Sequence, residues 1–310
     1  MTLFVQPKIV TPPTIDFLMK QSEKLHSYLF RHVCFGDPIA ASYIHCYLLS
    51  KLFKRENGGF IGQLPVGPLH VGLQGLLPED VTLIEERLKP LVGNLVKVTI
   101  EEQSLNQQQW APKYDEGQSK LLGGHLQLPA NTCFLVDETK FLGGKLTEKA
   151  LRNVDALRQI LIEGMLNYEY VFNTSVRIPT SLSALYLMGT TKPFIGNNVI
   201  TLPIRKRLEP PQKIPEDSFF NTIRVYLEYV KYHHPFSLLG NDGETLGNYL
   251  TQQFQTRRER NGAQDYTDED YGRDILIGRY LAMSKVLPSL NPEVYQQATF
   301  MEAARRDRLK

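Results

Sequence analysis

Two neighbouring carboxylates, Asp137 and Glu138, directly follow an uncharged run, Cys133-Phe134-Leu135-Val136. A short apolar run bounded by turn residues predicts a strand that is buried on both faces, as in the middle of a parallel sheet. The two acids then lie at the carboxyl end of the strand, the edge where open α/β sheets bind ligands. In P-loop nucleoside triphosphatases, such a strand end supplies an Asp that holds Mg²⁺ and a Glu that orients the attacking water.

Magnesium chemistry of this kind also needs a phosphate-binding loop of the form G-x-x-x-x-G-K-[ST]. The Gly144-Lys145 pair does not fit it, because Thr139 stands where the first glycine belongs and Leu146 follows the lysine. The loop is expected upstream, in the turn Gly75-Leu76-Leu77, which contains neither a lysine nor a hydroxyl. We therefore interpret Asp137 and Glu138 as a vestigial acidic pair and expect no catalytic residue, cofactor or metal.

The elements that would position this pair alternate between strand and helix. Leu69–Leu73 has period-two alternation, a helical pattern starts at Pro78, and Leu95–Glu101 alternates again. Strand, helix and strand within about 35 residues predict a βαβ unit and a parallel sheet. The polar stretch 103–118 predicts a surface loop held down by Trp110, the only tryptophan.

The rest of the α/β region continues this pattern. We expect a helix over 147–164 with an apolar face that includes Leu151 and Val154, and a hairpin over 168–178 with its tip at Asn173-Thr174. Two further strands are predicted, at 182–188 and 199–204.

The two ends of the chain have helical patterns. Two helices are expected before residue 57, the second capped by Asp37 and ended by Gly58-Gly59. Four helices are expected after the proline-rich stretch 205–217. The expected division is therefore N-terminal helices on the core (1–57), an α/β core (58–204), a linker (205–217) and a helical lid-like domain (218–310).

Composition narrows the class of protein. The chain has 310 residues, 42% of them hydrophobic and 22% charged, with a formal net charge of +2. These values are ordinary for a globular protein, and we expect neither a membrane span nor a secretory signal. Three widely spaced cysteines predict reduced thiols in an intracellular compartment. The spacing of His32, Cys34, His45 and Cys46 fits no common zinc motif.

Several longer stretches resemble one family, the minichromosome maintenance (MCM) complex-binding proteins, over their C-terminal half. They are GDPIAASYIHCYLLSKLFKR (36–55), LLGGHLQLPANTCFLVDET (121–139), the helix through Asn153–Leu157, and the C-terminal DYGRDILIGRYLAMS and MEAARRDRLK. The resemblance runs in order from about residue 7 to the end of the chain. The N-terminal half of the family, with its own folded segment, has no counterpart in this sequence.

The resemblance implies a degenerate relative of the MCM helicase subunits, with an AAA+-like core and lid. It also implies a nuclear protein that binds MCM subunits or subcomplexes in DNA replication, with roles in their assembly or chaperoning, in removal of the complex from chromatin, and in sister-chromatid cohesion. Where an active helicase keeps a phosphate-sensing Asn, this sequence has Met188-Gly189-Thr190. No Ser-Arg-Phe-Asp segment, which would supply an arginine finger, occurs between Phe194 and Arg207. The expectation is a non-catalytic binding protein.

Two alternatives remain open from the residues alone. The first is an ATP-binding module, active or regulatory, that uses Asp137 and Glu138. The second, weaker one is a DNA-binding module that uses the 168–178 hairpin and the basic runs 205–207, 257–260 and 305–310. Such runs are usually solvated faces or helix ends, so direct DNA binding is not expected.

Overall fold

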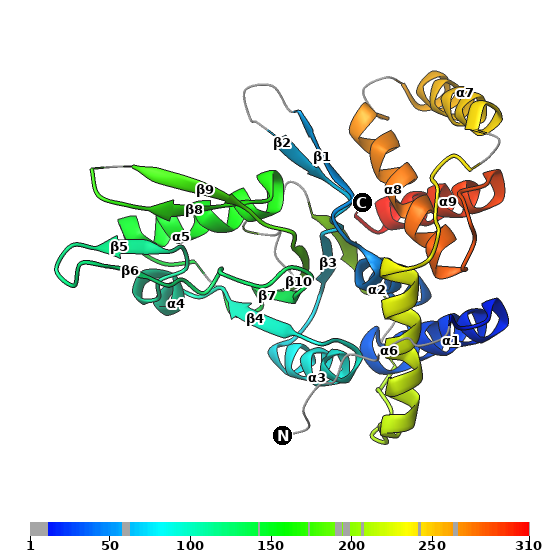
Figure 1. Ribbon diagram of the computed structural model, residues 1–310. Coiled ribbons are helices and arrows are strands. Elements are labelled where there is room, and N and C mark those ends of the chain that lie inside the picture. Colours follow the sequence, from blue (N-terminus) through cyan, green and yellow to red (C-terminus); the bar gives the residue numbers. More distant parts are fainter. Residues whose placement is uncertain are drawn as a thin grey trace. The chain divides into compact units, whose positions relative to one another are not determined.

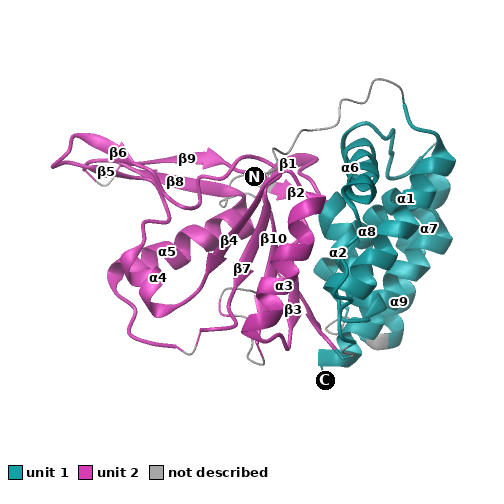
Figure 2. Cartoon of the chain, turned by 90° about the horizontal axis from the view of Figure 1, so that it is seen from below, with its two compact units in different colours: residues 1–49, 205–310 teal, residues 50–204 magenta. Residues whose placement is uncertain are grey.

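The computed structural model divides the chain into two compact units, residues 50–204 and residues 1–49 with 205–310 (Figure 2). The residues it describes are 12–57, 63–141, 143–172, 174–189, 194, 199–205, 208–240, 243–262 and 266–309. The first unit combines strands and helices and the second is helical. Each unit has its own core, and the two are described separately.

A five-stranded parallel sheet forms the centre of the α/β unit (Figure 1). Its spatial order is β11-β3-β10-β7-β4, with bounds β3 Val71–Gln74, β4 Leu95–Thr99, β7 Cys133–Asp137, β10 Ser183–Met188 and β11 Ile200–Pro203. Every residue of β7 is buried, and β7 lies between β10 and β4. The prediction of a doubly buried strand that ends at the acidic pair is therefore confirmed.

Three helices connect these strands: α3 (Pro78–Leu88), α4 (Glu102–Gln107) and α5 (Glu148–Arg158). The connection from β3 to β4 runs across the sheet toward one edge. The connections from β4 to β7 and from β7 to β10 run back in the opposite direction. Because parallel crossovers are right-handed, α3 and the pair α4 and α5 are placed on opposite faces.

The face covered by α4 and α5 has a continuous hydrophobic core that includes Phe134 and Val136 of β7. The α5 side chains in it include Ala150, Val154 and Leu157, spaced at four and three residues. Leu151 lies about 100° further round the helix and is 56% exposed, so its predicted place on the apolar face is wrong.

A second, four-stranded sheet has the order β6-β5-β8-β9, with bounds β5 Lys113–Asp115, β6 Lys120–Leu122, β8 Met165–Glu169 and β9 Ser175–Pro179. The antiparallel pair β8 and β9 confirms the predicted hairpin, although Asn173 at its tip lies outside the described residues. The predicted loop 103–118 is partly wrong, because most of α4 and all of β5 lie in it. Trp110 is fully buried, as expected of an anchor.

The helical unit contains α1 Ile15–Tyr28, α2 Pro38–Leu49, α6 Asp217–Tyr232, α7 Gly243–Asn261, α8 Asp268–Ser284 and α9 Pro292–Leu309. Asp37 caps α2 as predicted, since its Oδ1 accepts the N–H groups of Ile39 and Ala40 at 3.0 and 3.1 Å. Asp268, which the sequence predicts as the cap of the third C-terminal helix, is the first residue of α8, and Thr267 is its N-cap. The second helix ends at Leu49, before the predicted stop at Gly58-Gly59, which lies outside the described residues.

The strands β1 (Lys54–Asn57) and β2 (Gln63–Val66) form an antiparallel pair that the sequence did not predict. The N-terminal helices are grouped with the C-terminal ones instead of the α/β core. Buried polar contacts explain this grouping: Tyr43 donates to Glu302, and Ser22 donates to the carbonyl of Ser284 at 2.6 Å. The observed grouping differs from the expected boundary at residue 57.

Candidate functional site

The carboxyl ends of β3, β10 and β7 meet at one edge of the parallel sheet. Backbone hydrogen bonds join the three ends, from Glu138 N to Leu187 O at 2.8 Å, from Leu76 N to Met188 O at 2.9 Å, and from Gly75 N to Gly189 O at 2.9 Å. The structure thus brings the acidic pair and the Gly75 turn to the same edge. This is the edge where open α/β sheets bind ligands.

Asp137 is buried and stabilises the turn that follows it. Its Oδ1 accepts the backbone N–H of Thr139 at 3.0 Å and the hydroxyl of Thr139 at 2.7 Å. This is a local side-chain-to-backbone turn, in which the carboxylate orders its own chain two residues on.

Glu138 is also buried, and its Oε2 accepts the backbone N–H of Phe194 at 2.9 Å. The Phe194 ring packs on Phe141 with 4.4 Å between ring centroids. Burial, together with the nearby Glu138 charge, raises the pKa of the Tyr186 phenol well above its ordinary value. The acidic side chain is thus enclosed by the protein's own groups.

The Gly75 turn leads into the N-terminus of α3, which is where a phosphate would bind in a nucleotide site. A carboxylate already occupies this terminus, because Asp80 Oδ2 accepts the N–H of Leu77 at 2.7 Å. A negative charge here satisfies one helix N–H and repels a second anion. Sequence reasoning missed Asp80; an acid three residues after a helix cap is the signal that could have found it.

Two other positions singled out in the sequence are only partly described. At the expected sensor position, Met188 and Gly189 use their carbonyls in the turn contacts above, and Thr190 lies outside the described residues. Part of the segment between Phe194 and Arg207, which lacks the Ser-Arg-Phe-Asp motif of an arginine finger, also lies outside them (195–198 and 206–207).

Several arginines of the basic runs pair with acids of the helical unit. Arg257 contacts Asp274 at 3.1 Å and Arg306 contacts Asp270 at 2.8 Å. Arg305 contacts Glu302 at 2.9 Å through a nearly fully buried pair. Residues 206, 207 and 310 lie outside the described residues. In the described part of the runs, the side chains of Arg257, Arg305 and Arg306 form intramolecular ion pairs.

The histidines and cysteines whose spacing fits no common zinc motif lie in buried surroundings of other kinds. His45 Nε2 lies 2.9 Å from the Tyr226 hydroxyl, and burial lowers the pKa of His45 to about 3. Cys34 and Cys46 are free and buried. Within the described ranges, no group of three His, Cys, Asp or Glu side chains could hold a metal ion. No helix in the same ranges is long and apolar enough to cross a membrane.

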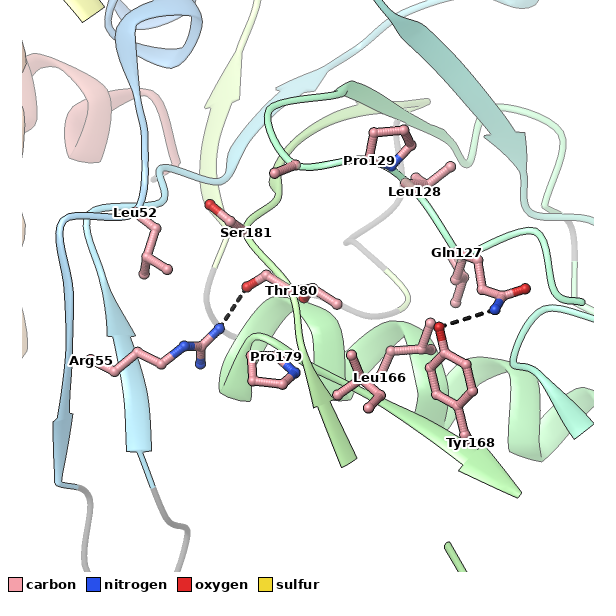
Figure 3. A pocket seen from close by; sticks show the side chains of 13 residues that line it. Leu52, Arg55, Gln127, Leu128, Pro129, Leu166, Tyr168, Pro179, Thr180 and Ser181 are labelled. Carbon is pink, nitrogen blue, oxygen red and sulfur yellow. Dashed lines mark hydrogen bonds between the residues drawn. The ribbon is translucent and has the colours of Figure 1, made fainter. Parts of the chain in front are cut away.

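A pocket of about 410 Å³ opens in the α/β unit, between the β1 strand, the segment before β7 and the β8–β9 hairpin (Figure 3). It is lined by Leu52, Arg55, Leu126, Gln127, Leu128, Pro129, Ala130, Leu166, Tyr168, Ile178, Pro179, Thr180 and Ser181. Gln127 Nε2 donates to the Tyr168 hydroxyl at 3.0 Å, and Arg55 donates to the Thr180 carbonyl at 2.7 Å. Sequence analysis missed this pocket because its walls come from three separate segments with no shared motif.

Fold and site together define an α/β protein in which the acids at the carboxyl edge of the parallel sheet accept hydrogen bonds from the protein's own chain. The family described as Mini-chromosome maintenance replisome factor matches residues 6–309. The chain belongs to this family.

Its relatives include the mini-chromosome maintenance complex-binding protein of Gallus gallus, 26% identical over 298 residues and covering 90% of this chain and 44% of the relative. The Homo sapiens protein of that name is 25% identical over 299 residues, covering 90% and 43%. The Arabidopsis thaliana protein is 23% identical over 275 residues, covering 89% and 45%. The chain therefore spans less than half the length of these relatives.

Proposed function

We propose that this chain binds the MCM complex in DNA replication, as a non-catalytic mimic of an MCM subunit. Membership of the family and the name of its relatives support the partner. The occupied sheet edge is the observation that favours a non-catalytic role. Asp137, Glu138 and Asp80 each accept hydrogen bonds from the protein's own groups at the place where a nucleotide would bind.

The geometry supports mimicry for a physical reason. A subunit-like surface needs the parallel sheet and its helices, and it does not need a working phosphate site. A buried carboxylate that already accepts hydrogen bonds gains little by exchanging these partners for a hydrated metal ion. Loss of the phosphate loop with retention of the sheet is what an AAA+-like scaffold without turnover would look like.

The same proposal places the protein in the nucleus, where MCM complexes act. Chaperoning of subunits, assembly or unloading of the complex, and sister-chromatid cohesion are the roles that such a scaffold would serve. Each of these roles requires only that the protein bind a subunit through its surface, without nucleotide turnover.

Co-expression with each MCM subunit, singly and in pairs, followed by size-exclusion chromatography with and without ATP, tests the proposal. We expect a stable complex whose elution does not depend on ATP. Failure of a folded, monodisperse chain to co-elute with any subunit would refute the proposed partner. A complex that forms only with ATP would contradict the expected ATP-independent binding.

A further inference from the structure

The outer edge of β9 pairs with no other strand of the described residues. Within the described residues, β9 is the last strand of its sheet, and all its residues, Ser175–Pro179, are exposed. An open strand edge presents unpaired backbone groups to any chain that can add as a further strand. In β9, Pro179 at one end and the charged Arg177 are of kinds that oppose such pairing, and Ser175, Val176 and Ile178 are not.

Two hydrogen bonds fix which backbone groups face outward. Tyr170 N donates to Thr174 O at 2.8 Å, and Thr180 N donates to Gly164 O at 2.7 Å. Both bonds share the register that pairs Tyr168 with Val176 and Leu166 with Ile178. Because hydrogen-bonded pairs alternate along an antiparallel ladder, Val176 and Ile178 bond inward, whereas Ser175, Arg177 and Pro179 point outward. The open edge thus offers the N–H groups of Ser175 and Arg177.

The same edge borders the pocket. Ile178 and Pro179 line the pocket together with Leu166 and Tyr168 of the neighbouring strand (Figure 3). Val176 and Ile178 share one face of the sheet and are 46% and 40% exposed. A strand added to β9 would place every second side chain on this apolar face.

Arg55 gives the pocket a positive charge. Its guanidinium donates to the carbonyls of Glu163, Gly164 and Thr180 at 3.3, 2.9 and 2.7 Å. It has no carboxylate partner in the described part of the chain, where the Glu163 side chain pairs with Arg177 instead. The lining residues include no acid, so the pocket is complementary to a carboxylate beside an apolar group.

We propose that the open edge of β9 and the adjoining pocket dock an extended segment of an MCM subunit, which adds as a strand, inserts an apolar side chain and turns a carboxylate toward Arg55. This inference rests on the proposed function, because it names the surface through which the partner is held. Strand addition obtains affinity from main-chain hydrogen bonds and specificity from pockets for alternate side chains. The outward N–H groups of β9 supply the main-chain hydrogen bonds, and the adjoining pocket accepts a side chain.

Arg177→Pro is the most direct test, because it removes an outward N–H and leaves the inward bonds of β9 intact. Arg177→Ala is the matched control, since it removes the same side chain and its contact with Glu163 but keeps the N–H. We expect Arg177→Pro to weaken the complex at least about tenfold and Arg177→Ala to weaken it less than about threefold. Equal affinity of Arg177→Pro and wild type would overturn the inference while leaving the proposed function standing.

A charge pair at the pocket mouth tests the chemistry of the segment. Ile178→Asp and Ile178→Lys both lose the apolar contact, but only the aspartate repels a carboxylate. We expect Ile178→Asp to bind several-fold more weakly than Ile178→Lys, with a difference that shrinks at high salt. The reverse order would overturn the acidic character of the segment.

Hydrogen exchange on the wild-type complex needs no variant. The amides of Ser175 and Arg177 should exchange at least about tenfold more slowly in the complex than in the free chain. Unchanged exchange at both amides, in a complex that forms, would overturn the inference. Protection that appears in the chain alone at high concentration would identify a second copy as the occupant and overturn it too. If wild type binds no MCM subunit, the proposed function itself fails and this inference fails with it.

Discussion

The carboxylate of Asp37 and the guanidinium of Arg308, 271 residues apart, form a two-point ion pair in the helical unit. Arg308 Nη1 lies 2.5 Å from Oδ2 and Nη2 lies 3.1 Å from Oδ1. Oδ1 also accepts the first N–H groups of α2, and the Asp37 side chain is 1% exposed. One carboxylate therefore caps α2 and ties it to the last turn of α9.

Removal of the arginine should destabilise the helical unit. In Arg308→Ala, the buried Asp37 charge loses its only ion-pair partner among the described residues. We expect the free energy of unfolding to fall by about 3 kcal/mol, because breaking a buried pair leaves an uncompensated charge. Urea denaturation followed by far-ultraviolet circular dichroism measures the change.

A solvent-exposed pair of the same unit supplies the control. Arg258 lies 3.9 Å from Asp268, and the two side chains are 40% and 86% exposed. Arg258→Ala should therefore cost less than about 1 kcal/mol, since exposed pairs contribute little. Similar losses of unfolding free energy in the two variants would show that the buried Asp37–Arg308 pair stabilises the unit no more than the exposed pair does.

Millimolar Mg²⁺·ATP should leave the melting temperature of the protein unchanged. A nucleotide at one hundred times its dissociation constant would stabilise the fold by about 2.7 kcal/mol, a readily measured shift. We expect no shift, because Asp80 occupies the α3 N-terminus and Glu138 binds the Phe194 N–H. Thermal denaturation at increasing ATP concentration is the measurement. A shift that is present in wild type and lost in Glu138→Gln would instead establish a nucleotide site.

The parallel sheet could be predicted because its signals are local. The run Cys133–Val136 and the alternation around Leu69–Leu73 each specify one strand from a few consecutive residues. The edge at which the acidic pair lies follows from strand polarity alone. The start of α2 was predicted from a similarly local signal, the Asp37 cap.

The features that could not be predicted from the sequence depend on contacts between segments far apart in the chain. The grouping of α1 and α2 with the C-terminal helices rests on pairs such as Asp37 with Arg308. The pocket draws its walls from residues near 52, 128 and 178, each ordinary in its own segment. Leu151 was misplaced because several faces of a helix with scattered leucines look apolar until its neighbours are known.

Asn153 should prove essential to the fold around the only tryptophan. Its buried side chain accepts the backbone N–H of Trp110 at 3.2 Å. It also donates to the backbone carbonyls of Leu105 and Gln108 at 2.8 and 3.0 Å. Asn153→Ala leaves these backbone groups unpaired, so we expect a loss of about 2–3 kcal/mol. Asn153→Asp keeps one acceptor and loses both donated bonds, and should be comparably damaging. Urea unfolding followed by Trp110 fluorescence measures both; a loss below about 1 kcal/mol in either would contradict the assignment.

Stability of the α/β unit should fall as the medium is acidified from pH 6.5 toward 4. Burial is the main cause that lowers the pKa of His70 to about 4, and His70 Nδ1 accepts the Ala184 N–H at 3.1 Å. Between the unfolded pKa near 6.5 and the folded value, the unfolded chain binds a proton that the folded chain excludes. The stabilisation is therefore complete above pH 6.5 and is lost as pH falls, by up to roughly 3 kcal/mol.

Urea unfolding followed by Trp110 fluorescence isolates this effect, because the only tryptophan lies in the same unit as His70. His70→Asn lacks the titrating ring, so its free energy of unfolding should change less between pH 7 and 4.5 than that of wild type. The variant will be less stable at pH 7, where it loses the packing of the imidazole, and the two curves should converge at low pH. Parallel curves for wild type and variant across this range would assign the acid sensitivity to groups other than His70.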